Sequence, residues 1–189
     1  MRNAAFSGAT MASLDGQFTR ILDTGYRPGY VTVLIGANDI CGTSLTAVND
    51  FRTQFTTAMT NLTSRSSGTS VFVASIPNLE QLYQLLKSNR NAQSTWANFR
   101  VCPRVLGANI VDRAPMIKHQ AALNGVLQEV CASFPSTATS KGCRFDGGAV
   151  FNTKFVATDV STVDYFHPSA AGQKKLSQAA WTASFWPTR

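Results

Sequence analysis

An aspartate and a histidine stand three residues apart near the carboxyl end of the chain, in the stretch from Val163 to Pro168. A histidine that acts as a general base needs one ring nitrogen facing the nucleophile and the other held by a carboxylate. Asp164 and His167 are spaced to meet that need locally. The alternative is a helix-capping turn, with Pro168 near the first helical position and His167 at the surface.

A second group of polar residues follows the β-branched apolar run from Tyr30 to Ile35, which stops at Gly-Ala-Asn-Asp. The run predicts a buried strand, and ligands bind at the carboxyl ends of parallel strands. The amide of Asn38 could there donate to a developing oxyanion. Upstream, a short strand-like run ends in small residues at Ser7 and Gly8, whose backbone N–H groups could supply a second donor. The alternative is a pair of ordinary turns.

In chain order the sequence contains Asn-x-Ala-x-Ser-Gly-Ala from residue 3, Gly-Ala-Asn-Asp from residue 36 and Asp-x-x-His-Pro from residue 164. Together these motifs resemble the SGNH (GDSL-type) ester hydrolase superfamily, and most closely its secreted actinobacterial esterases and lipases. The resemblance spans almost the whole chain. It implies that Gly8 and Asn38 form the oxyanion hole, that His167 is the base, and that Asp164 orients His167.

The family's nucleophilic serine lies in a Gly-Asp-Ser motif at the end of its first strand, and this sequence contains no Gly-Asp-Ser. The chain begins inside the block that follows this motif in the family. Ser7 is the nearest serine to a matched position, but in the family the serine beside that glycine is not the nucleophile. We therefore expect residues 1–189 to be one amino-terminally truncated SGNH-hydrolase-like domain, with its nucleophile upstream of Met1.

Alternating apolar patterns predict an α/β fold. We expect strands near 3–7, 30–36, 70–76 and 149–156, and helices near 13–23, 45–65, 79–88, 91–100, 112–133 and 168–184. The resemblance implies three α/β/α layers around a parallel, flavodoxin-like sheet in which the serine-bearing first strand is central. Without that strand, its neighbours would lose backbone partners and a hole would open in the core.

Two sets of residues have less specific patterns. The long predicted helix carries His119, which has no acid partner in a matching motif, so we expect a structural or surface role. Apolar side chains before that helix are candidates for an acyl pocket or for the core, and we favour the core: Leu79, Leu82, Tyr83, Leu85, Leu86, Trp96 and Phe99.

The four cysteines form an even set without the Cys-x-x-Cys spacing of metal sites, so we expect disulfides and no metal. Cys131 and Cys143 flank a Ser/Pro/Thr/Gly-rich loop and are paired in our prediction. Cys41 then pairs with Cys102, which would stiffen the chain after Asn38. Disulfides imply an oxidising, extracellular location, and four buried reduced thiols are the alternative.

The formal net charge of +7 comes from 17 Lys and Arg against 10 Asp and Glu. The basic residues stand singly or in the one pair Lys174-Lys175, without the interleaved aromatic residues typical of nucleic-acid modules. We therefore expect no nucleic-acid partner, and attraction to anionic lipid or wall polymers instead. The longest apolar runs are too short to span a membrane, and we expect a monomer.

These inferences predict a secreted serine ester hydrolase that works through an acyl-enzyme and needs no cofactor. Acyl glycerols, phospholipids, acetylated sugars and short acyl esters all suit this chemistry as substrates. The alternative is a fragment or degenerate relative that binds a lipid or a glycan without turnover.

Overall fold

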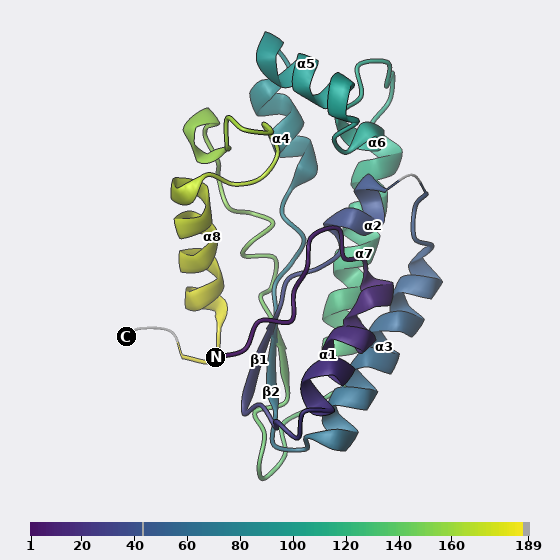
Figure 1. Ribbon diagram of the computed structural model, residues 1–189, viewed down its shortest axis with the longest axis vertical. Coiled ribbons are helices and arrows are strands. Elements are labelled where there is room, and N and C mark those ends of the chain that lie inside the picture. Colours follow the sequence, from purple (N-terminus) through teal and green to yellow (C-terminus); the bar gives the residue numbers. More distant parts are fainter. Residues whose placement is uncertain (43, 187–189) are drawn as a thin grey trace.

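The computed structural model describes residues 1–42 and 44–186 of the chain (Figure 1). Within these residues, β1 (Tyr30–Val33), β2 (Ser70–Val73) and β3 (Cys143–Phe145) form one parallel sheet in the order β1-β2-β3. Because each connection between parallel strands must cross a face of the sheet, helices separate the strands along the chain. The fold is α/β, as the sequence predicts.

Helices lie on both faces of the sheet and above the carboxyl ends of its strands (Figure 1). One face is covered by α1 (Leu14–Leu22), α3 (Val48–Arg65) and α7 (Ala114–Ala132), and the other by α8 (Ala170–Ala183). Above the strands lie α2 (Ala37–Cys41), α4 (Leu79–Leu86), α5 (Arg90–Phe99) and α6 (Pro103–Leu106). Short 3-10 turns, η1 (Met11–Ser13) and η2 (Ala157–Asp159), precede α1 and α8. The result is the predicted three-layer arrangement.

The central strand β2 divides the core in two, because successive side chains of a strand point to opposite faces. Val71 and Val73 belong to the larger cluster, which includes buried residues of α1, α3 and α7. Phe72 and Ala74 face the other way and pack with Val150 against α8. All four residues of β2 are buried, as expected for a strand with neighbours on both edges and helices on both faces.

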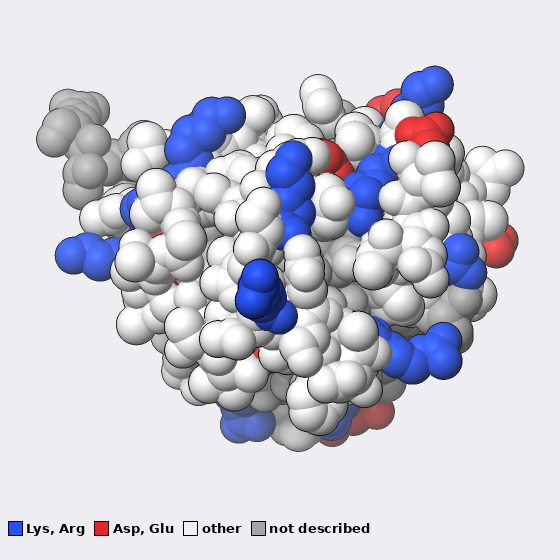
Figure 2. All heavy atoms as spheres, turned by 90° about the horizontal axis from the view of Figure 1, so that it is seen from above, with Lys and Arg blue, Asp and Glu red and all other residues white. Residues whose placement is uncertain are grey.

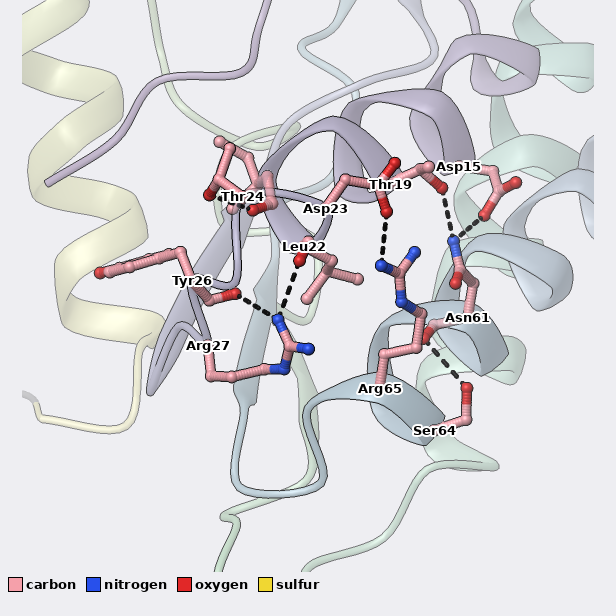
Figure 3. Close-up of polar contacts among 11 residues, drawn as sticks. Asp15, Thr19, Leu22, Asp23, Thr24, Tyr26, Arg27, Asn61, Ser64 and Arg65 are labelled. Atoms are coloured by element: carbon pink, nitrogen blue, oxygen red, sulfur yellow. Dashed lines mark hydrogen bonds and ion pairs between the residues drawn. The ribbon is translucent and has the colours of Figure 1, made fainter.

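Polar contacts join α1 to α3 on the sheet face that these two helices and α7 cover (Figure 3). The Nδ2 of Asn61 donates to Oδ1 of Asp15 at 2.6 Å and to Oγ1 of Thr19 at 2.9 Å. One turn further along α3, Arg65 forms an ion pair with Asp23 at 2.5 Å. These contacts hold α1 in place, and α1 forms one wall of the cavity described below.

The first strand, β1, is an edge strand rather than the buried strand predicted from its composition. Tyr30 is 37% exposed and Leu34 is 58% exposed. The carbonyl groups of Gly29 and Val33 accept hydrogen bonds from the neighbouring β2 segment. Because backbone groups alternate along a strand, those of Tyr30 and Thr32 face the other edge, where the described residues contain no further strand.

The predicted strands at 3–7 and 149–156 are wrong. Residues 3–7 are irregular, because a cavity separates them from β1 and leaves them without a strand to pair with. The 149–156 segment instead starts within a turn that begins at Gly147. Gly147 and Gly148 have positive φ there, and the Asp146 carboxylate accepts the N–H of Val150. The third strand is β3, which comes just before this turn.

The six predicted helices are confirmed, with shifts at their ends. The last one begins at Ala170 rather than at 168, because Ser169 is its N-cap and accepts the N–H of Gly172 through Oγ. Pro168 therefore lies just outside the helix. Two short helices, α2 and α6, were not predicted, since segments of four or five residues carry no readable helical period.

Both predicted disulfides are present, so the alternative of four reduced thiols is wrong. Cys41 at the end of α2 is bonded to Cys102, which lies between α5 and α6 and is 61 residues away in sequence. Cys131 in α7 is bonded to Cys143 in β3, 12 residues away. The first bridge fixes α2 relative to the helices above the sheet, and the second fixes α7 to the sheet itself.

Gly36, between β1 and α2, occupies a position where a side chain does not fit. Its φ is 115°, and a Cβ there would lie 2.6 Å from Cδ1 of the fully buried Ile76. We expect Gly36→Ala to lower the free energy of unfolding by about 2 kcal/mol or more, because left-handed strain and overpacking act together. Urea denaturation monitored by circular dichroism measures this loss.

The matched control is Gly16→Ala in α1, where a Cβ would meet open space. This substitution should raise the free energy of unfolding by about 0.5–1 kcal/mol, because alanine favours a helix interior over glycine. Equal effects of the two substitutions would contradict the packing described for Gly36.

Candidate active site

A cavity of about 900 Å³ runs along the outer edge of β1. Its walls are residues 1–6, the apolar side of α1 and the whole length from Tyr30 to Ala37, with further side chains from α4, α8 and the segment after β3. Asn38 and His167 both line this cavity. The chain passes from the carboxyl end of β1 to Asn38 in α2, so Asn38 lies near the end of that strand.

Asp164 and His167 form the contact that their spacing predicts. Nδ1 of His167 lies 2.6 Å from Oδ2 of Asp164, while Oδ1 accepts the N–H groups of Phe166 at 2.9 Å and of His167 at 3.0 Å. Partial burial acts to raise the pKa of Asp164, but these hydrogen bonds outweigh it and the pKa lies below its ordinary value. An ionised carboxylate on Nδ1 leaves Nε2 of His167, whose side chain is 69% exposed, for a reacting group.

The loop that carries this pair is closed by its own backbone and by α5. The N–H of Ser161 donates to the carbonyl of His167 at 2.8 Å, and the N–H of Tyr165 donates back to the carbonyl of Ser161 at 3.0 Å. Tyr165 has a φ of 54°, an uncommon conformation for a residue with a side chain. Its carbonyl accepts the indole N–H of the buried Trp96 at 3.0 Å, which holds the strained residue in place.

The base of the same loop is anchored on Asp159, which sequence reasoning missed. Its carboxylate is almost fully buried and accepts Lys175 Nζ at 2.5 Å and the N–H of Val156 at 2.7 Å. The hydrogen bond from Lys175 is the main reason that the pKa of Asp159 is lowered. A Cβ at Gly172 would lie 2.1 Å from the Asp159 carbonyl, so α8 packs directly on this turn.

Asn38 lies in the first turn of α2, next to the segment that contains Gly8. Its Nδ2 donates to the carbonyl of Ala9 at 2.9 Å, and since an amide carries two N–H bonds, one remains for another acceptor. Gly8 has a φ of 79° in a turn where the N–H of Ala9 points to the carbonyl of Phe6. Phe6, Ala9 and Asn38 line the cavity, and Gly8 stands between two of these lining residues.

Asp39, the residue after Asn38, fixes this arrangement from the buried side. Its Oδ2 accepts the N–H of Met11 at 2.9 Å and its Oδ1 accepts the hydroxyl of Thr46 at 2.7 Å. Burial raises the pKa of Asp39, although both hydrogen bonds and the charge of His119 oppose the rise. Sequence reasoning took Asp39 only as part of a turn. His119 is not among the residues that line the cavity, in agreement with the expectation that it is not a catalyst.

A second buried polar pair joins the ends of β2 and β3. The hydroxyl of Ser75, which is fully buried, donates to Oδ2 of Asp146 at 2.9 Å and accepts the N–H of Phe151 at 2.8 Å. This pair holds the segment that brings Val150 into the cavity wall. An isolated Ser and an isolated Asp, far apart in sequence, carried no signal that they would meet.

Most of the candidate acyl-pocket residues belong to the core, as favoured: Leu79, Leu82, Leu86 and Trp96 are buried in the larger cluster, and Tyr83 and Leu85 pack against it. Leu79 and Leu82 also line the cavity. Phe99 belongs to neither, since it is 77% exposed. Within residues 1–42 and 44–186, the structure has no cluster of three or more His, Cys, Asp or Glu side chains that could hold a metal ion. No helix in that part of the chain is both long and apolar enough to cross a bilayer.

The chain belongs to the GDSL-like Lipase/Acylhydrolase family, whose family model matches residues 1–175. This match includes the cavity edge at β1, the Asn38 segment and the loop with Asp164 and His167. It supports a hydrolase of the SGNH type. Neither curated proteins nor solved structures give a match to this chain.

The ion pair of Asp159 makes the stability of the fold depend on pH. Because the pKa of Asp159 is lowered on folding, the ionised group stabilises the folded state above its unfolded pKa of about 4. This contribution is lost as the pH falls through the lowered pKa of the folded state. We expect Asp159→Asn to lower the free energy of unfolding at neutral pH and to reduce the further loss on acidification.

Urea denaturation at neutral and acidic pH tests this prediction. Asp50→Asn is the control, because Asp50 is an exposed residue in the first turn of α3. An Asp159→Asn protein that loses as much stability on acidification as the unmodified chain would show that Asp159 is not the group responsible.

Proposed function

We propose that the chain is the greater part of a secreted serine ester hydrolase that works by acyl transfer in two steps. The observation that carries the proposal is the 2.6 Å contact between His167 and Asp164 beside the cavity that Asn38 also lines. A histidine held by an ionised carboxylate suits a general base. An amide with one unused N–H suits an oxyanion donor.

We propose further that the nucleophilic serine ends a strand that precedes Met1 and fills the cavity, so that all of 1–189 belongs to one domain. What supports this is the outer edge of β1, where the backbone groups of Tyr30 and Thr32 face the cavity. The edge from Tyr30 to Gly36 is roughly 20 Å long at about 3.3 Å per residue, a common length for a strand. A strand parallel to β1 in this place would end beside Asn38 and His167.

In the proposed reaction the serine hydroxyl attacks the ester carbonyl while Nε2 of His167 takes its proton. Asp164 stabilises the imidazolium, and the backbone N–H of Gly8 and the amide of Asn38 hold the oxyanion. The imidazolium then gives its proton to the leaving alcohol. Water repeats the same steps on the acyl-enzyme and releases the acid.

Two further features support the remaining parts of the proposal. Leu79 and Leu82 in the cavity wall are placed to contact an acyl group. The disulfides Cys41–Cys102 and Cys131–Cys143 favour an extracellular location, where such bonds persist.

The second candidate function is binding of a lipid without turnover. The observation in its favour is the cavity, because a largely apolar space of about 900 Å³ falls within the usual size range of ligand pockets. In this case the Asp164–His167 contact would serve only to shape the loop. The two candidates differ in whether any ester is hydrolysed.

Hydrolysis of a chromogenic acetate or butyrate ester tests the proposed function. We expect the 189-residue chain to show little activity, and a version extended upstream by the Gly-Asp-Ser strand to hydrolyse the ester. In the extended protein, His167→Ala should lower kcat by roughly 10⁴-fold or more. Asn38→Ala should lower it by about 10²- to 10³-fold. Lys118→Ala, at an exposed position of α7, is the control and should change kcat little.

Three results would contradict this proposal in different ways. Robust turnover by the 189-residue chain that is abolished by Ser7→Ala would make Ser7 the nucleophile. Activity of the extended protein that survives His167→Ala would remove the histidine from the mechanism. An extended protein that binds a fluorescent fatty acid without hydrolysing any ester would favour the second candidate.

A further inference from the structure

Basic side chains gather at the end of the molecule above the carboxyl ends of the strands. Between residues 81 and 111 the chain has four basic residues and no acidic one: Lys87, Arg90, Arg100 and Arg104. Lys87, Arg90 and Arg100 are exposed. Figure 2 looks onto this end, and more Lys and Arg than Asp and Glu side chains face the viewer. The local charge therefore favours an anionic partner.

Large apolar side chains are exposed to solvent at the same end of the molecule. Phe99 at the end of α5 is 77% exposed, Val111 between α6 and α7 is 101% exposed, and Val163 in the loop before His167 is 88% exposed. Phe99 makes little contribution to the core, so burial in the core does not account for an aromatic residue at this position. Exposed apolar side chains among basic ones are typical of surfaces that lie on anionic membranes.

This surface is joined to the candidate active site by two contacts. On the buried side of α5, Trp96 donates to the carbonyl of Tyr165, in the loop that carries both Val163 and His167. Three residues after Phe99, Cys102 is bonded to Cys41 at the end of α2, the helix that carries Asn38. In Figure 1, α5 and α6 lie above the sheet, at the end where the strands lead to the site.

We propose that this docking surface, made of α5, residues 100–111 and the loop 161–167, binds an anionic lipid bilayer. Phe99, Val111 and Val163 enter the interfacial region, and the exposed basic side chains contact the headgroups. If the proposed function holds, the substrate is an ester presented at a lipid surface, and only this consequence rests on the proposed function. Binding itself requires no turnover.

A soluble polyanion would use the same charges in a different way. It would contact Arg90 and Arg100 but would leave Phe99 and Val163 in water, so their removal would not weaken binding. A bilayer engages both kinds of side chain. The contribution of the apolar side chains therefore separates the two partners.

Cosedimentation of the 189-residue chain with vesicles tests the proposal. We expect binding to phosphatidylcholine vesicles that contain phosphatidylglycerol, weaker binding at high salt, and little binding to phosphatidylcholine alone. The double substitution Arg90→Glu and Arg100→Glu should weaken binding by on the order of tenfold or more. A negative charge suits the helix dipole at position 90, in the first turn of α5, and opposes it at position 100, the C-cap, so circular dichroism must show that the double variant keeps the fold. Phe99→Ala should weaken binding severalfold.

Matched controls come from exposed residues outside this surface. Lys141→Glu with Arg144→Glu makes the same change in net charge at the amino end of β3, the opposite end of the sheet. Trp181→Ala removes a 51% exposed aromatic side chain from α8. Both controls should bind vesicles as the unmodified chain does, and circular dichroism should give the same spectrum for every variant.

Three outcomes would overturn the proposal: no vesicle binding, equal weakening by the two charge variants, or a Phe99→Ala protein that binds as tightly as the unmodified chain. The last of these, together with strong binding to polyphosphate, would identify a polyanion contact instead. Vesicle binding without esterase activity in the extended protein would leave the docking surface in place and contradict only the proposed function. Activity on a soluble ester without vesicle binding would do the reverse.

Discussion

A strand inside a parallel sheet needs a hydrogen-bonding neighbour on each side, and this constraint explains much of the molecule. β2 meets it with β1 and β3, and all four of its residues are buried. In the part of the chain that the structure describes, β1 has a neighbouring strand on one edge only. The cavity, the exposure of Tyr30 and Leu34 and the irregular course of residues 3–7 all follow from that unpaired edge.

Each half of the candidate site, the Asn38 segment and the loop with Asp164 and His167, is held in place by a polar group buried behind it. Asp39 links η1 to α2 and so places Ala9 beside Asn38. Asp159 anchors one end of the loop with Asp164 and His167 to α8. Each buried carboxylate has hydrogen-bond partners, which is the condition under which burial of a charged group is tolerated. The two halves of the candidate site are therefore positioned by separate buried groups.

Two further contacts connect the candidate site to the surface above it. A disulfide ties α2 to the chain after α5, and an indole hydrogen bond ties α5 to the histidine loop. A ligand that moved or held α5 would thus act on both halves of the site. The proposed docking surface and the candidate active site are therefore joined by direct contacts.

Local patterns in the sequence were sufficient to predict the features that involve residues close to one another in the chain. The helical periods, the contact of Asp164 with His167 and the disulfide across the loop from Cys131 to Cys143 all involve residues close in sequence. The α/β class followed from the alternation of apolar runs, and the order of the three motifs pointed to the family that the match to residues 1–175 establishes. The pairing of Cys41 with Cys102 was reached because only these two cysteines remained.

Tertiary structure alone decided the features that depend on which segments become neighbours. An apolar run predicts a strand but not its position in the sheet, so the edge position of β1 could not be read from it. A strand also needs a partner, which is why the strands predicted at 3–7 and 149–156 did not form, while β3, only three residues long, formed beside β2. Asp39, Ser75 and Asp159 act through partners that the fold brings to them. The sequence motifs pointed to Asn38, Asp164 and His167 as candidate site residues, and the packing of distant segments determined where each of them lies.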